Sequence, residues 1–325
     1  MSKILKIILG ISGTICGIFL LIVIGLNIYF QINYSDFYAM AKKEFKIPGL
    51  SSGFTPQGIT ISAEGSFLTC GYMKDGSASR IYLLDDRQVY VELTEKDGTA
   101  DTNHAGGLAV YGDYLYLTNE RTISVYNLAD VLKASPGDRI TSVYNFPLDV
   151  VSAFVHVEQD KLYVGEFYRE ENYPTDKSHH MTTDAGNKHY ALMAVYALSK
   201  DAPYGFVKKV PEYVYSITGL AQGVCLTQNG KICLSTSYGT ANSHIYIYED
   251  PAQQAPDLKF EIAGAQVPLF YLDDNHLQET IKLFPMTEEL IAVDGRIYVM
   301  CESACNKYIF GKFTGNNYLY SFPAP

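Results

Sequence analysis

Residues 107–131 decide the fold and read GLAVYGDYLYLTNERTISVYNLADV. Three runs of alternating apolar and polar residues are separated by Gly-Asp and by Asn-Glu-Arg, which are turn-forming sequences. A period of two residues is typical of half-buried β-strands. The segment therefore predicts three consecutive antiparallel strands, and the run ITSVYNF at residues 140–146 supplies a fourth.

The same four-strand pattern recurs along most of the chain. Its five copies cover residues 58–95, 107–146, 153–217, 223–284 and 290–322. Four-stranded sheets repeated in this way predict an all-β fold, a β-propeller of five four-stranded blades. The fifth copy ends without an outer strand, and EFKIPGL at residues 44–50 can supply it and close the ring, with Pro48 at an edge position. A six-bladed ring stays open, because residues 252–284 are long enough to hold extra strands.

An apolar run precedes the repeats. Residues 7–30 carry no charge and are long enough to cross a bilayer as a helix. Lys3 and Lys6 precede the run, and no Lys or Arg follows it before Lys42, which favours a cytoplasmic N-terminus. A cleaved signal peptide is the rival interpretation, but its apolar region is shorter and it ends in an A-x-A-like site, which does not occur before Tyr34.

These observations predict the organisation of the chain and its location. We expect a cytoplasmic N-terminus at residues 1–6, a transmembrane signal anchor at 7–30, a linker at 31–43 and the propeller domain at 44–325. The propeller then lies on the extracytoplasmic side of the cell membrane, and the membrane itself is a partner through residues 7–30. The formal net charge of −10 argues against nucleic acid as a partner, so we expect none, since nucleic acid needs a basic surface.

The cysteine pattern argues against a disulfide framework. One of the six cysteines lies in the apolar run, which leaves an odd number outside it. Cys225 and Cys233 flank Asn229-Gly230, and a two-residue turn there would direct the two sulfurs to opposite faces of the sheet. Cys301 and Cys305 can form a bridge only if their strand ends between them.

Three stretches and one repeat resemble known propellers. YLYLTNERTISVYNLADV resembles the bacterial YVTN-type repeat, and residues 115–119 match it best. TPQGIT at 55–60, HAGGLAV at 104–110 and MCESACNKY at 300–308 resemble a family of secreted or membrane-anchored bacterial propellers of no established function. Strictosidine-synthase-like and lactonase-like propellers are related to this group. The resemblance implies the architecture, and the calcium ligands of the lactonase-like enzymes do not map onto this sequence residue by residue.

The register of the repeats predicts where a ligand would bind. Innermost strands begin, and second strands end, on one face of a propeller, where every blade contributes side chains near the axis. The candidate ligand-binding residues on that face are Gln57, His104, Asn119, Arg121, Glu166, Gln222, Tyr238, Glu288 and Glu302.

Some of these residues are also candidates for chemistry. His104 and Glu288 are the catalytic candidates, because an imidazole and a carboxyl group can exchange protons with a substrate. Glu166, Glu288 and Glu302 are candidates for a divalent cation such as calcium. The alternative is structural for all of them, as groups that bond to backbone or to channel water. The insertion at residues 169–189 contains three histidines and is either a lid over this face or a solvated loop.

The sequence contains no G-x-S-x-G elbow, P-loop or dinucleotide-binding fingerprint. The function we expect is a ligand-binding or protein-interaction module at the cell envelope, with a small polar ligand, a glycan or an envelope protein as its partner. The alternative is a metal-assisted hydrolase, similar to the lactonases, with its site at the axial mouth of the propeller.

Overall fold

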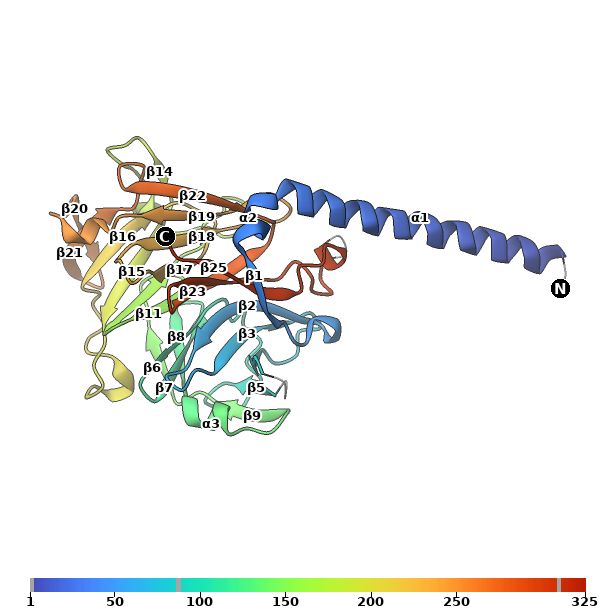
Figure 1. Cartoon of the computed structure of the whole chain (residues 1–325). Coiled ribbons are helices and arrows are strands. Elements are labelled where there is room, and N and C mark those ends of the chain that lie inside the picture. The colour runs from blue at the N-terminus through green and yellow to red at the C-terminus, as the bar shows by residue number, and fades with distance from the viewer. Residues whose placement is uncertain (1–2, 86–88, 309–310) are drawn as a thin grey trace.

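The computed structural model describes residues 3–85, 89–308 and 311–325. In this part of the chain, five β-sheets of four to six strands are arranged around one axis, and a long helix projects away from them (Figure 1). The expectation of an all-β five-bladed propeller preceded by an apolar helix is confirmed.

The five blades follow the chain in order. Blade 1 contains β2 (Phe54–Ile61), β3 (Phe67–Met73), β4 (Arg80–Leu83), β5 (Tyr90–Thr94) and β9 (Asp138–Thr141). Blade 2 contains β6 (Leu108–Tyr111), β7 (Tyr114–Asn119), β8 (Thr122–Asn127) and β10 (Tyr144–Pro147). Blade 3 contains β11 (Phe154–Glu158), β12 (Lys161–Gly165), β15 (Ala191–Ala197), β16 (Tyr213–Ile217), β21 (Ala265–Tyr271) and β20 (Leu258–Ile262). Blade 4 contains β17 (Ala221–Leu226), β18 (Ile232–Thr236), β19 (Ser243–Tyr248) and β22 (Leu277–Leu283). Blade 5 contains β23 (Thr287–Val293), β24 (Arg296–Cys301), β25 (Tyr318–Pro323) and β1 (Lys42–Lys46).

The ring is closed by the N-terminal strand. β1 pairs antiparallel with β25, so that the start and the end of the propeller share blade 5. The strand begins two residues and ends four residues earlier than EFKIPGL predicts, so it ends before Pro48. Proline has no N–H to donate to a strand ladder, which is consistent with a strand that stops at Lys46.

The long stretch at residues 252–284 does not form a sixth blade. Its extra strands β20 and β21 form a hairpin that joins the outer edge of blade 3, where β21 runs parallel to β16. In the same way β9 leaves the second repeat and pairs in parallel with β5 of blade 1. Strands added at blade edges cover backbone groups that would otherwise be unpaired.

The expected register of Cys225 and Cys233 is wrong. The turn spans Thr227 to Lys231, with Gly230 in the left-handed region at φ 78°, and it adds a residue to the hairpin. Cys225 therefore pairs directly with Cys233, and the two buried side chains share one face. Both are free thiols, as are Cys301 and Cys305.

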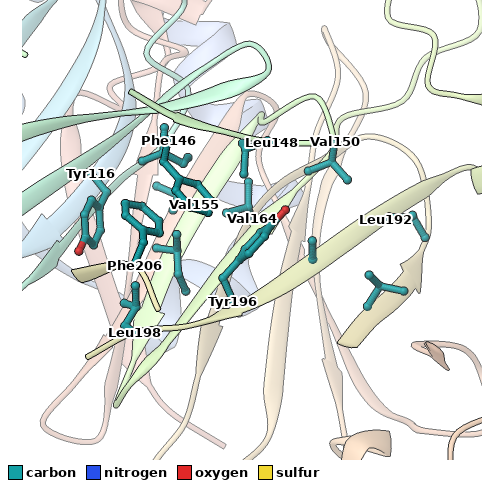
Figure 2. Close-up of a cluster of buried hydrophobic side chains, with 14 of the residues drawn as sticks. Tyr116, Phe146, Leu148, Val150, Val155, Val164, Leu192, Tyr196, Leu198 and Phe206 are labelled. Carbon is teal, nitrogen blue, oxygen red and sulfur yellow. The ribbon is translucent and has the colours of Figure 1, made fainter. Parts of the chain in front are cut away.

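Hydrophobic side chains fill the space between neighbouring blades. Between blades 2 and 3, the rings of Phe146 and Phe206 stack with their centroids 3.7 Å apart, and Tyr196 meets Phe146 edge-on (Figure 2). Burial of one such side chain stabilises the fold by about 1.5–3 kcal/mol. These layers hold the blades rigidly enough to position side chains around the axis.

The helix is tied to the propeller by a short second helix. α1 (Lys3–Asn33) is long and apolar enough to cross a membrane, and α2 (Ser35–Met40) follows it directly. Phe37 of α2 is buried and packs its ring 5.7 Å from that of Phe284 in the loop after β22. The hydroxyl of Tyr38 donates a 2.6 Å hydrogen bond to Asn316. The segment between α1 and the propeller is therefore docked on blades 4 and 5.

Candidate functional site at the axis

The axis of the propeller is closed by one carboxylate. Glu289 on β23 accepts hydrogen bonds from the backbone N–H groups of Ile59 (2.8 Å), Leu108 (3.0 Å) and Val155 (3.2 Å). These donors belong to the innermost strands of blades 1, 2 and 3. Burial raises the pKa of Glu289, while the three N–H donors act in the opposite direction.

Two glycines allow the strands to approach this side chain. A Cβ at Gly58 would lie 2.9 Å from Oε2 of Glu289, and a Cβ at Gly223 would lie 2.6 Å from its Cα. Each glycine follows a glutamine in the sequence, as PQGI and AQGV. The motif thus reflects crowding at the axis, where a larger residue would displace the central carboxylate.

A pair of carboxyl groups lies beside this centre. Glu288 and Glu302 are both buried, and they are close enough to share a hydrogen bond. Burial raises the pKa of both groups, and the charge of Glu302 raises that of Glu288 further. The pair therefore tends to hold a proton that two exposed glutamates would release.

Gln57 connects the pair to His104. Its amide nitrogen donates to Glu302 (2.9 Å) and to the carbonyl of Pro56 (2.8 Å), so its Oε1 atom is the acceptor for His104 Nε2 at 2.7 Å. This chain of bonds assigns the proton of the neutral imidazole to Nε2. His104 is exposed at this mouth, and the surrounding protein, and then the charge of Lys307, lower the pKa of its imidazole.

Aromatic and basic side chains cover the carboxyl pair. The rings of Tyr72 and His104 lie 4.5 Å apart, and Lys307 lies 4.8 Å from the centroid of Tyr72 and bonds to its hydroxyl. The hydroxyl of Tyr308 is directed at Glu302. The repeat places Tyr72 at the end of a second strand on this face, whereas sequence reasoning missed Lys307 and Tyr308 because they lie in an irregular loop that a strand repeat does not align.

The other predicted residues do not join this cluster. Asn119 bonds to Glu95 and Ser124, and Arg121 bonds to the carbonyl of Asp149. Gln222 makes a long 3.5 Å bond to the carbonyl of Ser237, and the exposed ring of Tyr238 is covered by the Arg169 guanidinium at 4.2 Å. The structure thus brings together Gln57, His104, Glu288 and Glu302. The contacts of Asn119, Arg121, Gln222 and Tyr238 lie elsewhere.

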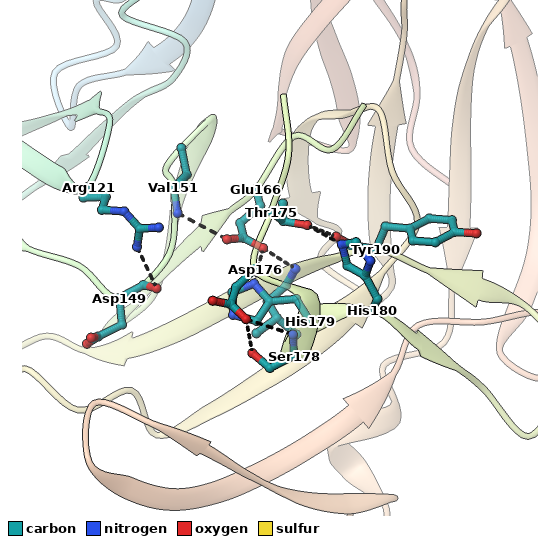
Figure 3. Close-up of polar contacts among 11 residues, drawn as sticks. Arg121, Asp149, Val151, Glu166, Thr175, Asp176, Ser178, His179, His180 and Tyr190 are labelled. Atoms are coloured by element: carbon teal, nitrogen blue, oxygen red, sulfur yellow. Dashed lines mark hydrogen bonds and ion pairs between the residues drawn. The ribbon is translucent and has the colours of Figure 1, made fainter. Parts of the chain in front are cut away.

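Glu166 has a structural role. Its carboxylate is buried and accepts hydrogen bonds from His179 Nδ1 (2.8 Å), Leu192 N (3.0 Å) and Val151 N (3.3 Å) (Figure 3). His179 belongs to the insertion after β12, Leu192 belongs to β15, and Val151 precedes β11. Glu166 therefore anchors this insertion, and it does not share a metal-binding group with Glu288 and Glu302.

The insertion at residues 169–189 is folded and not merely solvated. It contains the 3₁₀ helix η2 (Lys177–His179) and the hairpin of β13 (Met181–Thr182) and β14 (Lys188–His189). Its three histidines have separate partners, since His180 lies 3.0 Å from Thr175 Oγ1 and His189 lies 3.0 Å from Ser216 Oγ. Beside it is a hollow of about 470 Å³, lined by Tyr168, Glu170, Pro174, Thr175, Lys177, His180 and Tyr190.

The donor set at the axis does not suit a metal ion. Among residues 3–85, 89–308 and 311–325, no group of three or more His, Cys, Asp or Glu side chains is arranged to hold one. The predicted set of Glu166, Glu288 and Glu302 does not assemble, because Glu166 is bonded within blade 3 and its insertion.

Comparison with known proteins finds remote structural likeness only. No protein-family model matches the sequence, and the comparison with curated proteins finds no match. Among solved structures, the PQQ-bound aldose sugar dehydrogenase of Streptomyces coelicolor is 12% identical, with a TM-score of 0.48 over 87% of this chain and 97% of that one. Glutaminyl cyclase of Myxococcus xanthus is 12% identical, with a TM-score of 0.42 over 87% and 94%. A variant exo-β-1,3-galactanase of Phanerochaete chrysosporium is 14% identical, with a TM-score of 0.47 over 87% of this chain and 64% of that one. Likeness at this level assigns no activity to this chain.

Proposed function

We propose that this chain is a membrane-anchored, extracytoplasmic propeller that binds a small polar ligand, such as a sugar or polyol, at its axial mouth. The observation that carries the proposal is the buried pair of Glu288 and Glu302, bonded through Gln57 to His104. The anchor is α1, with Lys3 on its cytoplasmic side.

Carboxyl groups are costly to bury unless hydrogen bonds replace the lost water. Glu289 meets that condition with three backbone N–H donors. Its role in joining the blades is sufficient to explain why this carboxyl group is buried. Among the residues that the structure describes, no such set of backbone donors surrounds Glu288, and its pKa is raised by burial and by a neighbouring carboxylate. Strongly perturbed groups of this kind gather at functional sites more often than elsewhere.

The chemistry of the pair suits a hydroxylated ligand. A carboxylic acid donates a hydrogen bond and a carboxylate accepts one, so together they match a hydroxyl group or two adjacent hydroxyl groups. Gln57 and His104 offer further polar contacts beside them. The ring of Tyr72 adds an apolar face of the kind that packs against the C–H groups of a sugar.

One arrangement favours the alternative function, a hydrolase. A pair of buried carboxyl groups with raised pKa values, Glu288 and Glu302, is suited to general acid and general base catalysis. His104 is neutral, and a neutral imidazole is also able to accept a proton. Such an enzyme would act on the same class of ligand.

The test uses the full chain in detergent and a panel of sugars, polyols and lactones. We expect one class of compound to raise the melting temperature of the wild type, because a ligand that binds only the native state stabilises it. Glu302→Gln should abolish the shift. Glu170→Gln is the matched control, because it changes the same side chain at the hollow beside the insertion.

The outcomes separate the candidates. A shift that survives in Glu302→Gln and disappears in Glu170→Gln would move the site to the hollow and overturn the proposal. Mass spectrometry of the bound compound after incubation distinguishes binding from hydrolysis. A product that appears with the wild type and not with Glu288→Gln would establish the hydrolase.

A further inference from the structure

The loop between β24 and β25 lies beside helix α1. In Figure 1 this loop, coloured red, extends along the helix on the side where the helix leaves the propeller. The ring of Phe313, in the 3₁₀ helix η5 (Gly311–Phe313), meets that of Phe19 edge-on at 5.2 Å. The side chain of Asn27 donates hydrogen bonds to the carbonyls of Phe313 (2.5 Å) and Val23 (2.9 Å).

We propose that this part of the loop, residues 311–315, enters the outer leaflet of the membrane beside α1 and turns the axial mouth toward the bilayer surface. The inference rests on the proposed function, because it requires α1 to span a membrane. Its partner is a lipid bilayer, which the loop contacts with Phe313 and adjacent basic side chains.

The depth of Phe19 carries the argument. A hydrocarbon core of about 30 Å is crossed by about 20 helical residues, so a span that begins at Ile7 ends near Leu26. Phe19 then lies about 10 Å inside the core, about seven residues of helix below that end. A membrane boundary before Phe19 would leave Ile7 to Ile18 as the span, about 18 Å, which is too short. Since its ring contacts that of Phe19, the Phe313 ring extends toward that depth, while the Phe313 carbonyl lies at the level of Asn27.

Asn27 lies next to Leu26, where the membrane span is expected to end. An amide in or near the hydrocarbon core is costly unless its hydrogen bonds are satisfied. Its nitrogen has two carbonyl acceptors, and one of them comes from the loop. The bond therefore both satisfies the amide at the boundary of the membrane and fixes the loop at that height.

The charge around the loop agrees with contact with a bilayer. On a chain of net charge −10, the exposed residues Lys307 and Lys312 lie in this loop, and Lys282 lies 5.4 Å from the ring centroid of Tyr34, just past the end of α1. Lysines beside a membrane extend their apolar stems and place the charge among anionic headgroups.

The same loop carries part of the axial site. Glu302 and Lys307 stand at its start, where Lys307 covers the carboxyl pair through Tyr72. A loop held in the leaflet at Phe313 therefore places the axial mouth next to the membrane surface, and a ligand would reach it from there.

The chain contains no tryptophan, so a single introduced tryptophan reports its own surroundings. The full chain is reconstituted in vesicles of phosphatidylcholine and phosphatidylglycerol, with and without brominated acyl chains, which quench tryptophan on contact. Phe313→Trp reports the loop, Leu21→Trp reports the anchor, and Val207→Trp on the exposed turn of blade 3 reports solvent. Lys312→Trp serves as a second loop probe if circular dichroism shows that Phe313→Trp does not fold.

We expect blue-shifted emission and strong quenching by brominated lipid for Phe313→Trp and Leu21→Trp, and neither for Val207→Trp. Quenching of Leu21→Trp without quenching at the loop would overturn the inference and leave the anchor in place. No quenching at Leu21→Trp would remove the anchor, and the inference with it.

Discussion

Glu289 Oε2 lies 2.8 Å from the backbone nitrogen of Ile59, a bond that joins blade 5 to blade 1 at the centre of the propeller. The same carboxylate accepts N–H groups from blades 2 and 3. One side chain thus connects four of the five innermost strands. Backbone N–H groups at the axis of a propeller have no neighbouring strand on their inner side. The Glu289 carboxylate provides the hydrogen-bond acceptor that such a strand would supply.

Replacement of this carboxylate by an amide tests its role. In Glu289→Gln the side-chain oxygen can still serve two donors, but the amide nitrogen then faces a third N–H group. We expect the free energy of unfolding to fall by about 1–3 kcal/mol, the cost of a buried donor without a partner. Urea unfolding followed by circular dichroism measures it. Glu279→Gln, on an exposed face of β22, should leave the transition unchanged, and equal transitions for both variants would contradict the role of Glu289.

The carboxyl pair predicts a dependence of stability on pH. Burial, and then the charge of Glu302, raise the pKa of Glu288 above its usual 4.5. The folded state therefore keeps a proton that the unfolded chain loses above pH 4.5, so the free energy of unfolding falls as the pH rises through that window. The amide introduced by Glu288→Gln has no proton to lose. The melting temperature of this variant relative to the wild type should therefore increase from acid to mildly alkaline pH, and a constant difference would show that the group titrates normally.

The fold was predictable because it repeats. Each hairpin of a blade is local in sequence, so alternation and turn residues identify it without knowledge of the rest. The turn after Leu226 shows where this reasoning fails, since Asn229-Gly230 suits both a two-residue turn and the longer bulged turn that is present. Because the turn has one more residue than expected, Cys225 and Cys233 lie on the same face of the sheet and not on opposite faces.

The site was predictable only in part, for a related reason. Gln57, Glu288 and Glu302 sit at fixed positions of the repeat, so their convergence follows from the symmetry of the propeller. Lys307 lies in an irregular loop. The hydrogen-bond partners of Glu166 include His179, which belongs to an insertion in blade 3 that is outside the four-strand pattern. Contacts made by such segments are set by tertiary packing and leave no period in the sequence.

A buried histidine in the insertion gives an independent pH prediction. His189 of β14 is buried, and burial lowers its pKa to about 4. The folded state favours the neutral form of His189. The stability that this group contributes is therefore complete above pH 6.5 and is lost as the pH falls toward 4. The loss attributable to this group is at most about 3 kcal/mol. His189→Gln should show a smaller decrease in melting temperature over that range, and an equal decrease would contradict the assignment.

Chelation tests whether a cation takes part at the axis. In the described part of the chain, Glu288 and Glu302 lack the third ligand that would complete a metal-binding group. We expect EDTA to leave the melting temperature of the full chain unchanged, and elemental analysis to find less than one equivalent of calcium. A tight site saturated at roughly 100 times its dissociation constant would stabilise the native state by about 2.7 kcal/mol, so its removal would be measurable. If EDTA lowers the melting temperature of the wild type and not that of Glu302→Gln, the pair binds the ion, and the metal-assisted hydrolase becomes the better account of this site.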